Sequence, residues 1–125
     1  MKEPLWIRKE VALAIHDELL AEHGGATGLR DEGLLDSALA RPENLFSYEK
    51  VDLFSLAALY THGILRNHPF IDGNKRTAFL AGYVFLVKNK KELVASEAEA
   101  TQMVLDLVGK KLQEEEFAMW LKEHC

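Results

Sequence analysis

The chain has 125 residues, of which 48% are hydrophobic and 28% are charged, and its formal net charge at pH 7 is −5. This profile predicts one soluble domain over residues 1–125, and the acidic balance argues against a protein that binds nucleic acid by itself, because such proteins usually present a basic face. A single cysteine leaves no internal disulfide framework. No run approaches the ~18 apolar residues of a membrane span, and the first residues turn charged before a signal-peptide core forms. We therefore expect a cytoplasmic protein with no membrane partner.

The first part of the chain predicts two helices. Residues 5–23 carry apolar side chains at helical spacing, and the glycine pair at 24–25 ends this helix. A shorter helix is expected to begin after Asp31, which is a favourable N-cap, and to end before Pro42. Residues 42–51 carry no helical stripe, and we expect an irregular arm or a short hairpin there.

Two strongly apolar segments form the centre of the chain, at residues 52–67 and 74–89. Both are too long for single strands and are apolar on nearly every face, which predicts buried helices. After a connection at 90–95, the pattern predicts two further helices, over 96–108 and 113–123. The sequence therefore predicts an all-α bundle of about six helices with at most a short flap.

A polar loop, His68-Pro-Phe-Ile-Asp-Gly-Asn-Lys-Arg76, connects the two central segments. Pro69 disfavours the helical conformation of the residue before it, so the preceding helix should end near Asn67. Gly73 permits a backbone conformation, or a close approach, that a side chain would block. Asn74 is a good N-cap for the helix that follows.

The charged side chains of this loop indicate an anion site. Lys75 and Arg76 fall in the first turn of the following helix, where the helix macrodipole disfavours cations. Two cations beside free N–H groups are explained if an anion such as phosphate binds there. Asp72 lies next to this site and is a natural Mg²⁺ ligand beside bound phosphates. His68, at the other end of the loop, is suited to general-base chemistry near neutral pH.

Other kinds of site are poorly supported. His16 and His23 are seven residues apart, but nothing beside them indicates a metal, so we expect both to face solvent. A zinc hydrolase is not indicated, because no cysteine and no His-x-x-x-His pair accompanies His62 and His68. Cys125 is the last residue and is poorly placed for a nucleophilic thiol, and the sequence contains no P-loop run of the form Gly-x-x-x-x-Gly-Lys-Ser/Thr.

The loop resembles the signature of the Fic/Doc family (filamentation-induced-by-cAMP and death-on-curing proteins). The Fic form of this signature is His-Pro-Phe-x-Asp/Glu-Gly-Asn-Gly-Arg, and the loop matches it everywhere except at Lys75, where most Fic proteins carry glycine. A lysine followed by an arginine is the mark of the death-on-curing (Doc) branch. The resemblance also covers residues 27–42 and the length of the chain, and it implies a compact helical domain of the Fic/Doc type.

The resemblance implies a nucleotide-dependent transferase that modifies a protein hydroxyl. In this interpretation, His68 takes the proton from the attacking Ser, Thr or Tyr hydroxyl, and Asp72 holds Mg²⁺ against the phosphates of ATP, the co-substrate. Lys75 and Arg76 also serve catalysis by stabilising charge, as such transfers require. The anionic part of the nucleotide is then bound by four consecutive residues: Gly73, Asn74, Lys75 and Arg76.

The family contains two reactions, and the loop carries marks of both. Fic enzymes transfer AMP, whereas Doc toxins transfer the γ-phosphoryl group of ATP to a threonine of elongation factor Tu and stop translation. Lys75 favours phosphoryl transfer, because its bulk and charge can relocate the phosphates. Pro69 and Gly73 follow the Fic form, which keeps AMP transfer as the alternative. A non-catalytic binding module is a second alternative, although simple anion binding would not require His68.

The resemblance also implies partners. Many Fic proteins are blocked by a helix of the form Ser/Thr-x-x-x-Glu-Gly/Asn, but here Gly28 stands four residues before Glu32-Gly33. Inhibition is therefore expected in trans, by an antitoxin whose C-terminal segment folds on binding. In Fic-type proteins a flap beside the active site holds the backbone of the target. The resemblance implies this role for residues 42–51, although composition alone favours a plain surface connection.

Overall fold

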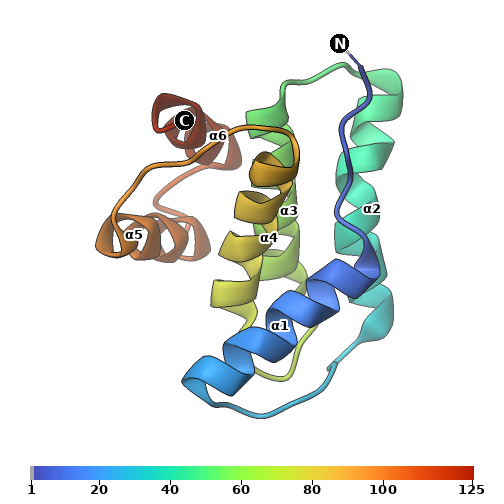
Figure 1. Ribbon diagram of the computed structural model, residues 1–125, viewed down its shortest axis with the longest axis vertical. Helices are drawn as coiled ribbons and strands as arrows, with labels where there is room; N and C mark the ends of the chain where they lie inside the picture. Colours follow the sequence, from blue (N-terminus) through green and yellow to red (C-terminus); the bar gives the residue numbers. More distant parts are fainter. Residues whose placement is uncertain (1) are drawn as a thin grey trace.

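The computed structural model describes residues 2–125, and this part of the chain folds into six α-helices (Figure 1). Within it the only extended pairing is a single antiparallel bridge between Leu29 and Phe70, so the all-α prediction is confirmed. None of the helices in residues 2–125 combines the length and the apolar character needed to cross a membrane. The helices are α1 (Lys9–His23), α2 (Glu32–Tyr48), α3 (Leu53–Asn67), α4 (Asn74–Lys88), α5 (Glu97–Val108) and α6 (Glu114–Glu123).

Helix α3 forms the centre of the domain, with α4 beside it and antiparallel to it (Figure 1). α2 and α6 also pack against α3, and α1 packs across α4. The two central helices approach closely, because the Thr61 hydroxyl donates to the Ala78 carbonyl at 2.8 Å. A Cβ atom on Gly82 would lie 2.5 Å from Thr61 Oγ1, so this position requires glycine. The polar loop therefore connects two helices that pack closely against each other.

The segment before α1 is extended rather than helical, which corrects the predicted start of the first helix. The Ile7 N–H donates to the Tyr60 hydroxyl at 3.0 Å, and the backbone of Leu5 exchanges hydrogen bonds with the side-chain amide of Asn89. Burial raises the pKa of Tyr60 well above its ordinary value, so the hydroxyl remains neutral. The helix begins only at Lys9 because these earlier residues are tied to α3 and to the end of α4.

The arm predicted over residues 42–51 is wrong, because α2 continues through Pro42 to Tyr48. Proline interrupts the hydrogen bonds of a helix, but the Pro42 ring is fully buried, and Phe46 on the next turn is buried as well. Tertiary packing therefore outweighs the local preference of proline.

The flap role implied for residues 42–51 also fails on position. The connection after α2 leads into the start of α3, whereas the polar loop follows the end of α3 (Figure 1). The 15 residues of α3 separate the two connections by about 20 Å at 1.5 Å per residue. The segment between α2 and α3 is therefore at the wrong end of the bundle to act as a flap.

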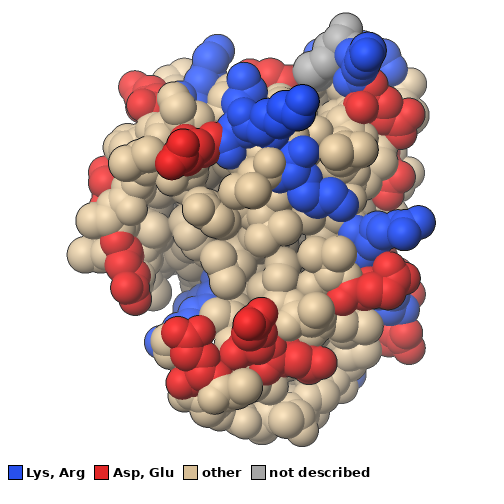
Figure 2. Space-filling model, viewed as in Figure 1, with Lys and Arg blue, Asp and Glu red and all other residues tan. Residues whose placement is uncertain are grey.

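Charges of both signs cover the surface, and they are not evenly mixed. On the face shown in Figure 2, acidic side chains gather over α1, while Lys and Arg gather toward the opposite end of the molecule. Binding of an anion near α1 must therefore depend on local groups rather than on a general positive field. The exposed acidic residues of α1 are Glu10, Asp17, Glu18 and Glu22.

Candidate active site

His68 ends α3 in a strained conformation that several contacts maintain. α3 ends at Asn67 as predicted, and His68 adopts the left-handed region with φ 50° and ψ 55°, which is uncommon for residues other than glycine. The Arg30 Nε donates to the His68 carbonyl at 2.7 Å, and its guanidinium also donates to the Asn67 carbonyl at 2.9 Å. A cation at a helix C-terminus satisfies carbonyls that have no partner within the helix. Arg30 therefore positions His68, a role that the sequence analysis missed.

Asn74 is buried and its side chain bonds to the polar loop, whereas the sequence predicted that it would be the N-cap of the following helix. Gly73 takes the N-cap position with φ 79°, and Asn74 is the first residue of α4. The Asn74 Oδ1 accepts from the Phe70 N–H at 3.0 Å, and its Nδ2 donates to the Phe70 carbonyl at 2.9 Å. The side chain is satisfied by the loop, so it does not cap the helix.

The same amide determines the tautomer of His68. The Phe70 backbone requires the oxygen of the Asn74 amide on one side and the nitrogen on the other. The Asn74 Nδ2 therefore faces His68 Nδ1, at 3.0 Å, as a donor. A neutral His68 then carries its proton on Nε2. For Nε2 to accept a proton, the other tautomer must form and this contact must open.

Asp72 presents an exposed carboxylate that backbone groups hold in place. Its Oδ1 accepts from the Gly73 N–H at 2.9 Å, and its Oδ2 accepts from the Ala26 N–H at 3.3 Å. A Cβ atom on Gly25 would lie 2.8 Å from Asp72 Oδ2, and Gly25 also has a φ of 124°. Glycine at position 25 therefore lets the segment after α1 close against the carboxylate.

The donor chemistry of Asp72 fits a magnesium ion, but only as part of a shared site. Carboxylate oxygens are preferred Mg²⁺ ligands, and Mg²⁺ sites commonly use one or two carboxylates together with substrate phosphates and water. Among residues 2–125, no group of three or more His, Cys, Asp or Glu side chains could hold a metal ion. A metal at Asp72 would thus need ligands from outside the protein, such as phosphate oxygens and water, to complete its coordination.

Lys75 and Arg76 lie exposed in the first turn of α4, as predicted. The first bond of this turn runs from the Thr77 N–H to the Gly73 carbonyl at 3.1 Å, and the N–H groups before it have no partner within the helix. Two cations and free N–H groups therefore share the start of α4. This combination suits an anion.

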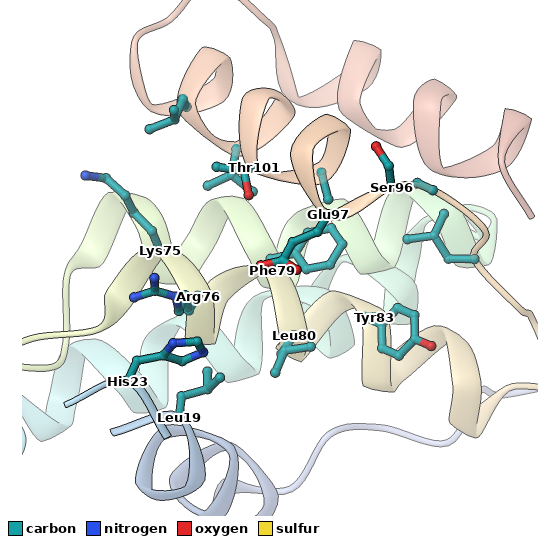
Figure 3. Close-up of a pocket in the computed structure, with 15 residues that line it drawn as sticks. Leu19, His23, Lys75, Arg76, Phe79, Leu80, Tyr83, Ser96, Glu97 and Thr101 are labelled. Atoms are coloured by element: carbon teal, nitrogen blue, oxygen red, sulfur yellow. The ribbon is translucent and has the colours of Figure 1, made fainter. Parts of the chain in front are cut away.

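The two cations also line one end of a groove of about 580 Å³ between α1, α4 and α5 (Figure 3). Its walls are mostly apolar and include Phe79 and Leu80 of α4 and Val104 of α5. In Figure 3, Tyr83 lies toward the end opposite Lys75. The anion site therefore lies at one end of a mostly apolar groove.

The segment from residue 24 to residue 31, between α1 and α2, lies beside the polar loop. The Arg30 N–H donates to the Pro69 carbonyl at 2.7 Å, and the Ile71 N–H donates to the Gly28 carbonyl at 3.1 Å. These two bonds flank the bridged pair of Leu29 and Phe70, so the N–H and carbonyl of Leu29 point away from Phe70. The glycine-rich composition of this segment was the available signal, but its pairing depends on contacts distant in sequence.

His16 is buried, which contradicts the prediction that it faces solvent. Its side chain is 2% exposed, because the face of α1 that carries it packs onto the polar loop. Its ring stacks on Phe70 with centroids 3.8 Å apart, and its Nε2 donates to the Asp72 carbonyl at 2.8 Å. For His23 the prediction is confirmed, since that residue is exposed and lines the groove.

Comparison with known proteins shows the family to which the chain belongs. The sequence profile of the Fic/DOC family matches residues 6–86, which include the whole of the polar loop, and the chain belongs to this family. It is 36% identical over 84 residues to the protein kinase doc of Escherichia phage P1, across 66% of this chain and 67% of that relative. It is 42% identical over 76 residues to the toxin Doc of Mycolicibacterium smegmatis, across 58% of this chain and 57% of that relative.

Proposed function

We propose that this chain is a protein-kinase-type transferase of the Doc class, which acts as a toxin by transferring the γ-phosphoryl group of ATP to a protein hydroxyl. The observation that carries the proposal is the pair of cations, Lys75 and Arg76, at the start of α4, in the same loop as His68 and Asp72. The similarity to a protein kinase doc and to a toxin Doc supports the reaction and the biological role.

The geometry supports a separate role for each residue in binding ATP and in transferring the phosphoryl group. The start of α4 binds the phosphates through its free N–H groups, Lys75 and Arg76. Asp72 would hold Mg²⁺, which when bound supplies neutralisation of the phosphate charge. His68 receives the proton of the attacking hydroxyl, once its contact with Asn74 opens and Nε2 becomes an acceptor.

The segment 24–31 takes the flap role that the family resemblance had implied for residues 42–51. The unpaired edge of Leu29 could hold an extended target segment by main-chain hydrogen bonds, and it lies next to the polar loop. The family resemblance points to a threonine of elongation factor Tu as the acceptor. We propose that the modification occurs in the cytoplasm and blocks translation.

Labelled nucleotide tests the reaction directly. With purified elongation factor Tu and Mg²⁺, ATP labelled at the γ-phosphate should label the target, whereas ATP labelled at the α-phosphate should not. Mass spectrometry of the target should then find one added phosphoryl group on a threonine. Transfer of the α-label would support the alternative, AMP transfer, which Pro69 and Gly73 favour by following the Fic form. Absence of transfer from either label, to this target and to any protein of a cell lysate, would support a non-catalytic binding module.

We also propose an antitoxin that binds in trans along the groove between α1, α4 and α5. A helix or extended segment with apolar side chains would fit its walls, and a carboxylate near one end would pair with Lys75 and Arg76. Such a segment would cover the phosphate site while it lies in the groove. This arrangement would explain inhibition without an inhibitory helix in the chain.

Growth of a bacterial host tests the partner. Expression of the chain alone should arrest growth, co-expression of a separately encoded partner should restore it, and His68→Ala should not arrest growth at all. Thr101→Glu, at an exposed position on the α5 wall of the groove, should keep the toxicity but weaken rescue, because it places a charge against apolar partner side chains. Undisturbed growth with active protein at detectable levels would contradict the toxin role, and full rescue of Thr101→Glu would place the antitoxin elsewhere.

A further inference from the structure

The buried histidine of α1 contacts the polar loop at successive points. Its ring stacks on Phe70, its Nε2 donates to the Asp72 carbonyl, and a Cβ atom on Gly73 would lie 3.6 Å from its ring. We propose that His16 is a positioning residue, which fixes the peptide between Asp72 and Gly73 and thereby aims the Asp72 carboxylate. The consequence for metal binding rests on the function proposed above, but the positioning itself does not.

The geometry of one peptide bond links His16 to the Asp72 carboxylate. In a trans peptide the C=O and the N–H point in opposite directions. Because His16 holds the Asp72 C=O on the buried side, the Gly73 N–H points to the other side, where it donates to Asp72 Oδ1 at 2.9 Å. The hydrogen bond from His16 therefore orients the donor that holds the carboxylate.

Glycine at position 73 makes this control necessary. Rotation of the peptide between residues 72 and 73 changes φ of residue 73, which is 79°. Glycine accepts positive and negative φ at similar cost, so little steric strain opposes rotation. If the peptide rotated, Oδ1 would lose its donor and the carboxylate would keep only the longer bond from the Ala26 N–H. A donor fixed on α1 removes this freedom.

A purely structural role for His16 would make a different demand on the side chain. Stacking on Phe70 and filling the buried space could be achieved by an apolar side chain of similar volume. Only a donor at the Nε2 position can satisfy the Asp72 carbonyl, which would otherwise be left without this bond. Two variants separate these demands. His16→Leu fills the space without a donor, and His16→Gln places an amide N–H where Nε2 stood.

The first readout is independent of nucleotide and metal. The chain has eight glycines, so ¹⁵N-glycine labelling gives a small set of amide resonances in which Gly73 can be assigned. The Gly73 resonance should shift in His16→Leu toward that of an unbonded, mobile glycine and should stay near its wild-type position in His16→Gln. Circular dichroism should show that both variants are folded.

The second readout is metal affinity without turnover. Calorimetric titration of Mg²⁺ into protein saturated with a non-hydrolysable ATP analogue should give about 10–100-fold weaker binding for His16→Leu, the usual cost of losing a group that orients a metal ligand. His16→Gln should lie much closer to the wild type. If the wild type binds neither analogue nor metal, the proposed function fails while the Gly73 readout still tests the positioning.

Two results with the variants would overturn the proposal. One is a Gly73 resonance in His16→Leu that matches the wild type. The other is the same Gly73 resonance and the same Mg²⁺ affinity in the leucine and glutamine variants, which would mean that His16 contributes only through the packing of its ring. If His16→Leu does not fold, the wild type decides by itself. Its ¹⁵N-histidine spectrum must show the proton of His16 on Nε2, and an unprotonated Nε2 would contradict the inference.

Discussion

Replacement of His68 by alanine is expected to reduce phosphoryl transfer by about 10²–10⁴-fold, the usual loss when a positioned general base is removed. The protein should remain folded, because His68 is exposed and its side chain makes one hydrogen bond, to Asn74. His68→Asn is a second test of the same role. Asparagine tolerates the left-handed conformation of this position better than most residues, yet it cannot act as a base.

The measurement is the initial rate of γ-label transfer together with the thermal midpoint of each variant. Arg66→Ala serves as the control, because Arg66 is an exposed basic residue in the last turn of α3 and has no part in the proposed site. This control should keep near wild-type rates. Turnover close to wild type in a folded His68→Ala variant would remove His68 from the mechanism and leave positioning and charge stabilisation as the source of catalysis.

Local patterns were sufficient to predict the two central helices and the polar loop between them. The long apolar segments could only form buried helices, and Pro69 set the end of α3 at Asn67. The loop residues carry chemistry that is visible in their types alone, so Lys75 and Arg76 lie where they were expected. Each of these predictions needed only residues that are neighbours in the sequence.

Predictions that depended on distant contacts failed. Pro42 did not end α2, because burial of its ring and of Phe46 compensates for the lost backbone bond. His16 could be placed correctly only by knowing that α1 crosses the polar loop. Asn74 bonded to Phe70 and His68 instead of capping α4, since the fold of the loop offered its amide more partners than the cap did.

The position of the segment proposed to hold the target shows the same limit. Residues 42–51 and 24–31 are both short of apolar periodicity, and although only the second is rich in glycine, composition does not say which of them lies beside the polar loop. The structure does, because only the second pairs with the loop through Leu29 and Phe70. A bridge between residues so far apart in sequence is a property of how the helices pack, which the pattern of a single segment does not contain.

The lysine at position 75 is expected to determine which phosphorus of ATP is attacked. It lies exposed in the first turn of α4 beside Arg76, where its charge can hold phosphates that a glycine would leave free to bind elsewhere. Lys75→Gly should lower γ-phosphoryl transfer by about 10²-fold or more, the cost of removing one group that stabilises developing charge. The fold should survive, since glycine in a helix costs only about 1 kcal/mol.

The variant should also gain some transfer of AMP, because Gly73, Asn74 and Arg76 already match the pattern of the AMP-transferring relatives. Lys75→Met separates the two properties of the lysine, since it keeps most of the bulk and removes the charge. If charge places the phosphates, Lys75→Met should lose γ-transfer as Lys75→Gly does. If bulk blocks the other orientation of the nucleotide, only Lys75→Gly should transfer AMP.

Parallel reactions with α-labelled and γ-labelled ATP, on the same target and with all three proteins, decide between these outcomes. The hypothesis requires γ-transfer by the wild type and its loss in Lys75→Gly, with any new signal coming from the α-label. Transfer of the α-label by the wild type would show that the lysine does not set the direction. Gly73, with its left-handed backbone at the start of α4, would then be the better indicator of the reaction, and the protein would transfer AMP despite a lysine typical of the toxins.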